Sequence, residues 1–321
     1  MTGGLRFGVE EEFLTVDPVS RVVTPAAPGI IKRARETLGD RVGAEFTDMQ
    51  AEARTTPCVT AADLHAQLVE GRAVLASAAA EIGVGVVAAA APVLGRVVPA
   101  AVVDDDRHRH GDEAYRALHD EITICSAHVH VEVPDRDRAV LVSNHLRPYL
   151  PTLIALTANS PYWCGRDTGY ASWRTISLQR WPVAGPPPYF TSARHYDQTV
   201  EALLGTGALV DQGTIFWDVR PSHHLPTLEI RVADVPLTAT ETALLAVLVR
   251  ALVGRALAAV EQGDPGPQVP PALLRAAYWR AARDGFRGAA VNLADGTLSP
   301  AIDQIDTLLD QLPSPGRWPA S

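Results

Sequence analysis

Three adjacent carboxylates, Glu10, Glu11 and Glu12, lie inside a largely apolar run at residues 5–16. The neighbouring Phe and Val residues favour a β-strand. Because strand side chains alternate between faces, Glu10 and Glu12 share one face and Glu11 points to the other. Two like charges a few ångströms apart repel each other, and a hard cation such as Mg2+ relieves that repulsion. The run therefore predicts a metal site, with an exposed strand carrying a charged face as the alternative.

A second polar row follows the strand predicted at residues 122–133. One face of this strand is apolar, and the other carries Ser126, His128, His130 and Glu132. Two histidines and a carboxylate in register favour a ligand-binding role over histidines buried in a core.

Another acidic segment contains Glu45 and Glu52, which are seven residues apart. This interval places them on one face of a helix but on opposite faces of a regular strand. The spacing alone leaves open whether they converge on one site or belong to a solvated surface segment.

Strands are also predicted at residues 214–220 and 226–232. Alternation places Glu229 and Arg231 on the same face of the second strand. Such a pair is either a plain ion pair or a metal ligand beside a phosphate-binding arginine.

The stretch at residues 159–188 is aromatic and polar, and it shows no periodicity. Loops of this length inside a compact domain are uncommon unless they bind something. Its arginines are candidates for binding a carboxylate or phosphate, although each is also explained as a surface residue: Arg166, Arg174 and Arg180.

The composition excludes several classes of function. A net charge of −9 without a basic block argues against nucleic acid or an anionic membrane as the partner. The only lysine is Lys32, which does not follow a glycine-rich turn. P-loop, Schiff-base and pyridoxal chemistry are therefore disfavoured, and any bound phosphate is expected to be held by arginine.

The chain shows no secretory signal peptide, and its apolar stretch at residues 82–95 is too short to span a bilayer. Three cysteines, an odd number without zinc-site spacing, fit buried thiols in a reducing compartment. These features predict a cytoplasmic location.

Helical periodicity and capping signals predict the elements that must support these strands. Helices are expected at residues 30–38, from a cap at Thr60 to about residue 80, at 139–160 with a break at Pro148 and Pro151, and at 241–260, 271–283 and 300–312. The charge-dense segment at 104–113 is expected to be an exposed loop, or a lid over a charged ligand. With no repeat or linker, residues 1–321 are expected to form a single domain.

Taken together, these segments resemble the carboxylate-amine ligases of the type 2 glutamate-cysteine ligase family, in the glutamine synthetase superfamily. The resemblance covers nearly the whole chain and rests on six ordered motifs: GVEEEF at 8–13, the segment 45–58, HVHV at 128–131, ANSP with DTGYAS at 158–172, WDVRPS at 217–222, and EIR at 229–231.

The resemblance implies an α+β fold in which a curved, mostly antiparallel sheet forms an open funnel with helices on its outer face. It implies ATP-dependent joining of a glutamate-like side-chain carboxyl to a small amine such as cysteine through an acyl phosphate, with Mg2+ or Mn2+ as the metal. The implied metal ligands are Glu10, Glu12, Glu45, Glu52, His128 and Glu229. Arg220 and Arg231 would stabilise the transferring phosphoryl group, His130 and Arg231 would lie near the nucleotide, and Arg174 and Tyr170 near the acid substrate. The family also suggests a homodimer.

The sequence departs from the family pattern at Glu132 and Ser126, where glycine is usual, and in the spacing before Cys58. It also ends before a final helical segment that many members carry. Two alternatives are therefore kept: a metal-dependent hydrolase that uses the same His and Glu ligands on water, and a non-catalytic ATP- and Mg2+-binding sensor.

Overall fold

An antiparallel sheet of seven strands organises the computed structural model, which describes residues 4–100 and 106–311. The strand order is β10–β11–β5–β1–β3–β2, and β4 pairs with the end of β1. Every pairing within this sheet is antiparallel, and the sheet stays open instead of closing into a barrel, so the predicted fold class is confirmed. Its strands are β1 (Phe7–Val16), β2 (Val42–Ala44), β3 (Gln50–Arg54), β4 (Gly85–Val87), β5 (Ser126–Glu132), β10 (Val219–Pro221) and β11 (Thr227–Asp234).

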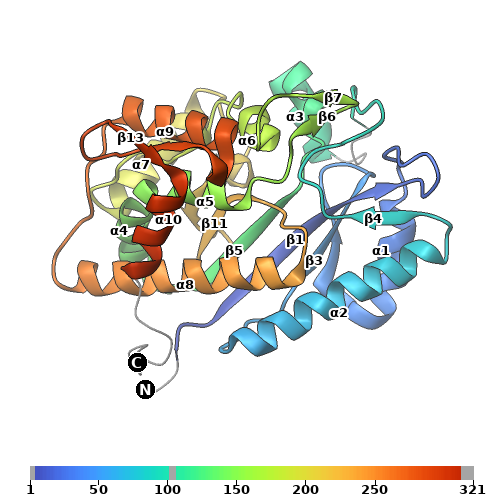
Figure 1. Ribbon diagram of the computed structural model, residues 1–321, viewed down its shortest axis with the longest axis horizontal. Helices are drawn as coiled ribbons and strands as arrows, with labels where there is room; N and C mark the ends of the chain where they lie inside the picture. Colours follow the sequence, from blue (N-terminus) through green and yellow to red (C-terminus); the bar gives the residue numbers. More distant parts are fainter. Residues whose placement is uncertain (1–3, 101–105, 312–321) are drawn as a thin grey trace.

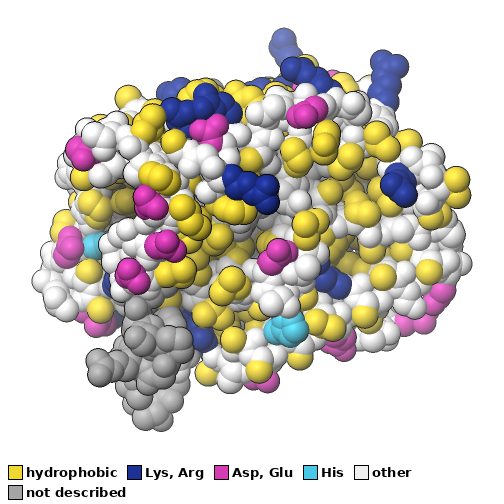
Figure 2. Space-filling model, in the orientation of Figure 1, with side chains coloured by type: hydrophobic (Ala, Val, Ile, Leu, Met, Phe, Trp, Pro, Cys, Tyr) yellow, Lys and Arg dark blue, Asp and Glu magenta, His cyan; other side chains and the backbone are white. Residues whose placement is uncertain are grey.

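Helices cover one face of this sheet (Figure 1). On one half lie α1 (Ala27–Leu38) and α2 (Ala61–Ala80), and α8 (Ala239–Glu261) crosses β5 and β1. Against β10, β11 and α8 pack α4 (Arg136–Leu146) and α5 (Leu150–Thr157), with α9 (Pro271–Asp284) and α10 (Ala301–Asp310) outside α5. The space-filling view shows apolar side chains mixed with scattered charged ones on this side of the molecule (Figure 2).

The remaining elements are short or lie beside the sheet. They are α3 (Asp106–Tyr115), α6 (Trp173–Leu178), α7 (Ala193–Gly205), the small strands β6 (Tyr162–Trp163), β7 (Arg166–Asp167), β8 (Ala184–Gly185), β9 (Phe216–Trp217), β12 (Ala289–Val291) and β13 (Leu298–Pro300), and the 3-10 turns η1 (Gly39–Arg41), η2 (Arg116–Glu121), η3 (Arg147–Tyr149), η4 (Gln212–Thr214) and η5 (Gly285–Arg287).

The largest core lies between the sheet and its helices. Alternate residues of the central strands point into it, including Val129 and Val131 of β5 and Leu228 and Ile230 of β11, and all four are buried. This burial of one strand face leaves the opposite side chains of the same strands facing the inner side of the sheet.

The predicted cap at Thr60 is confirmed, and α8 begins two residues before the start predicted at 241. The Thr60 side chain accepts a hydrogen bond from the Asp63 N–H at the start of α2. Thr238 and Glu241 form a reciprocal capping box at the start of α8. Helix α8 is long and apolar enough to cross a membrane, but half of its most apolar window is buried within the protein. Its packing on β5 and β1 explains its composition as that of a core helix.

The structure corrects two predictions about loops. Residues 106–115 form helix α3, whereas a loop was expected, and residues 104 and 105 lie outside the described part of the chain. Tyr115 at the end of α3 packs on Trp181, with 4.7 Å between ring centroids, and this contact anchors that end of the charge-rich helix. The stretch 159–188, expected to be a loop, contains the short helix α6, and Ser172 caps it by accepting from the Thr175 N–H.

The predicted break at Pro148 and Pro151 is confirmed by η3, which separates α4 from α5.

Candidate active site

A cavity of about 940 Å³ opens on the inner face of the sheet, opposite the helices that bury Val129 and Ile230. Its floor is made by side chains from β1, β3, β5, β10 and β11, and its rim by the segments 204–216 and 222–225. Among the lining residues are Glu10, Glu45, Glu52, Arg54, His128, His130, Arg220, Glu229 and Arg231.

Strand register brings the polar residues of this floor together. Glu10 lies directly opposite His128 on the neighbouring strand, and Glu229 lies opposite His130. Glu12 lies opposite Glu52. Alternation predicted which side chains share a face of each strand, and the register of the paired strands brings them opposite one another.

Glu11 points to the other face, as alternation predicts. Its carboxylate accepts hydrogen bonds from Arg72 of α2 at 2.5 and 3.0 Å and from the Thr242 hydroxyl of α8 at 2.5 Å. The middle carboxylate of the three therefore joins the sheet to its helices, while its two neighbours face the inner side.

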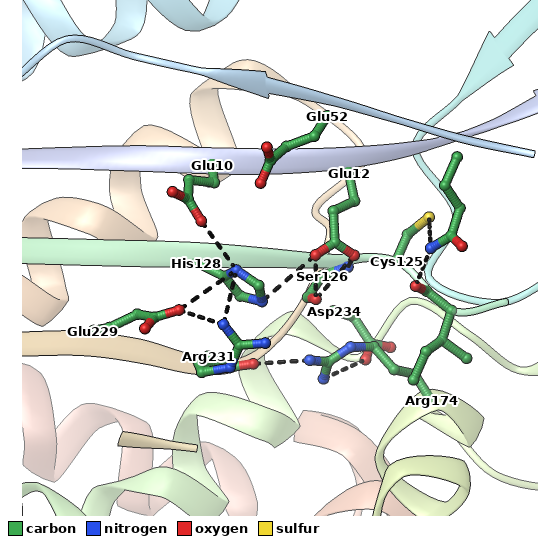
Figure 3. Close-up of polar contacts among 12 residues, drawn as sticks. Glu10, Glu12, Glu52, Cys125, Ser126, His128, Arg174, Glu229, Arg231 and Asp234 are labelled. Carbon is green, nitrogen blue, oxygen red and sulfur yellow. Dashed lines mark hydrogen bonds and ion pairs between the residues drawn. The ribbon is translucent and has the colours of Figure 1, made fainter. Parts of the chain in front are cut away.

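His128 is the centre of a group of atoms that could hold a metal ion (Figure 3). Its Nδ1 lies 3.3 Å from a Glu10 carboxylate oxygen and 3.8 Å from one of Glu229, and its Nε2 lies 3.6 Å from Glu12. One ligand atom from each of Glu10, His128 and Glu229 lies within 4.8 Å of the other two. Their separation is that of ligands around a single ion.

The chemistry of these donors fits a divalent cation. Carboxylate oxygens with one imidazole suit Mg2+ or Mn2+. Among the described residues, the buried Nε2 atoms of His128 and His130 have no hydrogen-bond partner, as expected of ring nitrogens kept for another ligand. Burial and the charge of Arg231 lower the pKa of His128, which keeps its ring neutral and able to coordinate.

Both carboxylates of this group are held ionised. Burial alone would raise the pKa of Glu10, but the hydrogen bond from His128 and the nearby His130 ring lower it below its usual range. Burial also opposes ionisation of Glu229, and there the nearby Arg231 and Arg220 lower the pKa.

Two arginines flank Glu229 and add positive charge to one wall. Arg220 donates from Nε to one Glu229 oxygen at 2.9 Å and from Nη1 to the Ile215 carbonyl. Arg231 donates to the other Glu229 oxygen and lies 3.4 Å from Nδ1 of His128. Carboxylates that could hold a metal lie beside fixed guanidinium groups, an arrangement suited to stabilising a charged phosphoryl group.

The comparison with known families favours a ligase over a metal-dependent hydrolase or a non-catalytic sensor. The model of glutamate-cysteine ligase family 2 matches residues 6–317. The chain belongs to this family. As a family 2 member it is an ATP-dependent carbon–nitrogen ligase of the carboxylate-amine type, and use of ATP with a divalent metal follows from that membership.

Two curated relatives carry the printed name "Putative glutamate--cysteine ligase 2-1". That of Saccharopolyspora erythraea is 44% identical over 310 residues, covering 96% of this chain and 81% of the relative. That of Nocardia farcinica is 46% identical over 304 residues, covering 94% and 79%.

Solved structures show the same fold at low sequence identity. A bifunctional glutathione synthetase from Pasteurella multocida superposes with a TM-score of 0.69 at 14% identity, over 98% of this chain, which spans about half (46%) of that longer protein. A glutamate–cysteine ligase from Francisella tularensis, solved in complex with AMP, gives 0.65 at 13% identity over 96% of this chain and 77% of its own.

The remaining ligands predicted from the family 2 motifs surround this centre. Glu12 is buried and accepts from the Ser126 N–H at 2.8 Å and from its hydroxyl at 3.1 Å. Glu52 lies in β3, and Glu45 lies in the connection before it, and both line the cavity. Burial and the charges of Glu10 and Glu45 raise the pKa of Glu52, because several carboxylates share this end of the site.

His130 also lines the cavity. Its Nδ1 lies 2.9 Å from the Thr227 hydroxyl, and its Nε2 lies 3.5 Å from Glu10. Burial would lower the pKa of His130, but the close Glu10 carboxylate raises it. The structure thus places His130 beside the metal-binding group.

Arg174 and Tyr170, predicted near the acid substrate, lie outside the set of cavity-lining residues. Arg174 is buried behind β11, where its Nη2 donates to the Arg231 carbonyl at 2.8 Å. The Tyr170 hydroxyl accepts from the Trp279 indole N–H at 3.2 Å. Their role in substrate binding stays a prediction.

The sequence analysis missed Arg54, which lies in the cavity wall 3.1 Å from Glu52. A signal was available, because Arg54 is two residues after Glu52 and alternation places both on one strand face. Gly43 on the neighbouring strand makes room for it, since a Cβ there would lie 2.4 Å from Arg54 Nη2. His223 and His224 at the rim were also missed, and they lie in an exposed connection without periodicity.

Proposed function

We propose that this chain joins the side-chain carboxyl of glutamate, or of a similar acid, to a small amine such as cysteine through an acyl phosphate. The observation that carries the proposal is the union, in one cavity, of the Glu10–His128–Glu229 group with the arginines that flank Glu229. Family membership limits the reaction to carboxylate-amine ligation but leaves the two substrates open.

The proposed reaction has two steps. A carboxylate oxygen of the acid attacks the γ-phosphorus of ATP and ADP leaves. The amine nitrogen then attacks the acyl carbon, the phosphate leaves with its bonding electrons, and the nitrogen loses a proton. Neither step requires a nucleophile from the protein, which agrees with a cavity lined by ligands and cations.

Six side chains would hold the metal ions: Glu10, Glu12, Glu45, Glu52, His128 and Glu229. Bound Mg2+ or Mn2+ would offset the negative charge of the ATP phosphates. The chain's own contribution is to fix these donors on paired strands before substrate arrives, so that little reorganisation is needed during the reaction.

Arg220 and Arg231 would stabilise the charge that develops on the transferring phosphoryl group, and His130 would lie beside the nucleotide. Both guanidinium groups are mostly buried, with side chains 14% and 16% exposed, so their field is weakly screened by water. The assignment of Arg174 and Tyr170 to the acid substrate rests on the family resemblance alone.

The same resemblance supports three coarser proposals. Residues 1–321 would form one catalytic domain, consistent with a single family model over 6–317. The chain would act in the cytoplasm, where its three cysteines, all free thiols in the structure, would stay reduced. It would assemble as a homodimer.

The test is Mg2+-dependent release of ADP from ATP with L-glutamate, screened with cysteine and other small amines. Turnover that needs both the acid and the amine would support the ligase and identify the acceptor. A Glu229→Gln variant should lose this turnover, and a Glu132→Gln variant, at the partly exposed end of the same strand system, should keep it. ATP binding without ADP release for any pair would overturn the proposal in favour of a sensor, and hydrolysis that ignores ATP would favour a hydrolase.

A further inference from the structure

The regular pairing of strand β11 is interrupted next to the cavity, just after Ile230. Ile230 pairs with Val129, but the next pair is Ala233 with Ala127. The chain therefore advances three residues along β11 for two along β5, which leaves one extra residue at Arg231–Val232. A β-bulge of this kind redirects a side chain and leaves backbone groups without their ladder partners.

Arg174 donates hydrogen bonds to two backbone carbonyls at the bulge. Its Nη2 donates to the Arg231 carbonyl at 2.8 Å, and its Nη1 donates to the Val232 carbonyl at 3.3 Å. The side chain of Arg174 is only 3% exposed, so these carbonyls are bonded inside the protein and not to solvent. Figure 3 shows the Arg174 guanidinium beside the Arg231 carbonyl, on the side away from Glu229.

Arg174 is itself held in place by a buried carboxylate. Asp234, at the end of β11, lies 3.8 Å from Arg174 Nη1. Asp234 also accepts from the Asn159 N–H at 2.8 Å and from the hydroxyls of Ser160 and Ser172 at 2.7 and 2.9 Å. Since Ser172 caps α6, which begins with Trp173 and Arg174, this network fixes the start of that helix relative to β11.

The opposite side of the bulge is fixed as well. The Arg231 N–H donates to the Asp218 carbonyl at 2.8 Å. With its N–H bonded to Asp218 and its carbonyl bonded to Arg174, the Arg231 backbone is held at both ends. Its side chain is then directed at Glu229 and His128.

We propose that Arg174 is a positioning residue: by bonding the carbonyls of Arg231 and Val232, it sets the bulge that aims Arg231 at Glu229. This role rests on the proposed function of Arg231 in phosphoryl transfer. It differs from the binding of the acid substrate that the family resemblance implies for Arg174, and the two roles predict opposite kinetics.

The first test is Arg174→Lys, which keeps the positive charge but cannot bond both carbonyls with a planar fork. A positioning role predicts that kcat falls about 10- to 100-fold, because a misplacement of about 1 Å costs that much. The KM values for ATP, the acid and the amine should stay within about threefold of wild type. A rise of tenfold or more in KM for the acid alone, with kcat unchanged, would show a substrate clamp and overturn the proposal.

The second test asks whether Arg174 acts through Arg231. We compare Arg174→Lys, Arg231→Lys and the double variant in a cycle. If Arg174 acts only by placing Arg231, the double variant should be no slower than Arg231→Lys within about threefold. If the fold-losses of kcat in the two single variants multiply in the double variant, the two arginines act independently and the proposal is contradicted.

A matched control is Arg147→Lys. Arg147 is another buried arginine that donates to a backbone carbonyl, that of Pro187 at 2.8 Å, but it lies in η3 away from the bulge. It should retain kcat within about threefold. An equal loss of kcat in Arg147→Lys would show that any buried arginine has this effect, and the proposed role would fall.

Crystal structures of the wild type and of Arg174→Lys separate this proposal from the proposed function, because they do not depend on turnover. The expected result is an Arg231 guanidinium that has left Glu229, with the β11 register changed between Ile230 and Ala233. An unchanged Arg231 would overturn the proposal even in an active ligase. If Arg174→Lys does not fold, Asp234→Asn replaces it, since it removes the charge facing Arg174 while keeping the side-chain shape, and the same displacement of Arg231 is required.

Discussion

Glu10 and Glu229 approach the same nitrogen of His128, at 3.3 and 3.8 Å, although their strands are not neighbours in the sheet. Strand β5, which carries His128, lies between β1 and β11. The candidate metal site formed by Glu10, His128 and Glu229 is therefore complete only when three strands, distant in sequence, have paired. Binding of a cation should consequently depend on the folded sheet and stabilise it.

Addition of Mg2+ or Mn2+ to metal-free protein should raise its melting temperature, because the ion binds the folded state and not the unfolded one. A ligand at 100 times its Kd contributes about 2.7 kcal/mol. In Glu229→Gln the metal concentration that gives half of this shift should rise about tenfold or more. Differential scanning calorimetry measures both, and an identical metal response in wild type and variant would remove Glu229 from the ligand set.

Replacement of Glu52 by Gln should stabilise the metal-free protein at pH 8. Burial and the charges of Glu10 and Glu45 raise the pKa of Glu52 in the folded state, so the folded protein holds this proton more tightly than the unfolded chain. Stability is then lost as pH rises through that raised value. Relative to wild type in EDTA, Glu52→Gln should melt about 2 °C or more higher at pH 8 and show no advantage at pH 4.

The same Glu52→Gln variant should show a smaller stabilisation by added Mg2+, because it lacks one predicted ligand. A variant that melts lower than wild type at pH 8 in EDTA would contradict the argument from carboxylate repulsion. Glu132→Gln is the control, since the hydrogen bond from Arg6 lowers the pKa of Glu132 and its removal relieves no repulsion.

On the helix-covered face, Arg72→Met should destabilise the fold by about 3–5 kcal/mol, because it leaves the buried Glu11 carboxylate without its positively charged partner. Urea unfolding measures this loss. Arg138→Met breaks an ion pair whose side chains are 48% and 56% exposed, and such surface pairs contribute about 0–1 kcal/mol. If Arg72→Met lost no more free energy of unfolding than Arg138→Met, the Glu11–Arg72 pair would not link the sheet to α2.

Replacement of Lys32 by Gln should leave ligase turnover within about twofold of wild type. Lys32 is the only lysine in the chain, and it lies exposed on α1, where it does not line the active-site cavity. Steady-state ADP release measures the effect. Loss of turnover in a folded Lys32→Gln protein would require a catalytic amine and would contradict phosphate binding by arginine alone.

Alternation along single strands was sufficient to predict which way each residue of the first and fifth strands faces. It placed Glu10 and Glu12 on one face and Glu11 on the other, and it aligned His128 with His130. The reason is physical: in a sheet with one buried face, a shift of one residue would bury the wrong side of the whole strand.

Spacing failed where two residues belong to different elements. Glu45 and Glu52 converge because the chain turns between them, so neither a helical nor a strand period applies. The burial of Arg174 was equally beyond reach, since it depends on carbonyl acceptors that exist only after β11 has bulged. Helix α3 was missed because its charged residues suggest a loop, while its contact with Trp181 comes from a distant segment.

The close approach of Gly43 to Arg54 restricts how relatives of this chain can diverge. Any side chain at position 43 would push the Arg54 guanidinium away from Glu52. Because the Arg54 side chain is flexible and 40% exposed, it can move aside, so a larger residue at position 43 would cost the Arg54–Glu52 contact and not the fold. We expect the two positions to vary together, so that glycine at the first accompanies arginine at the second.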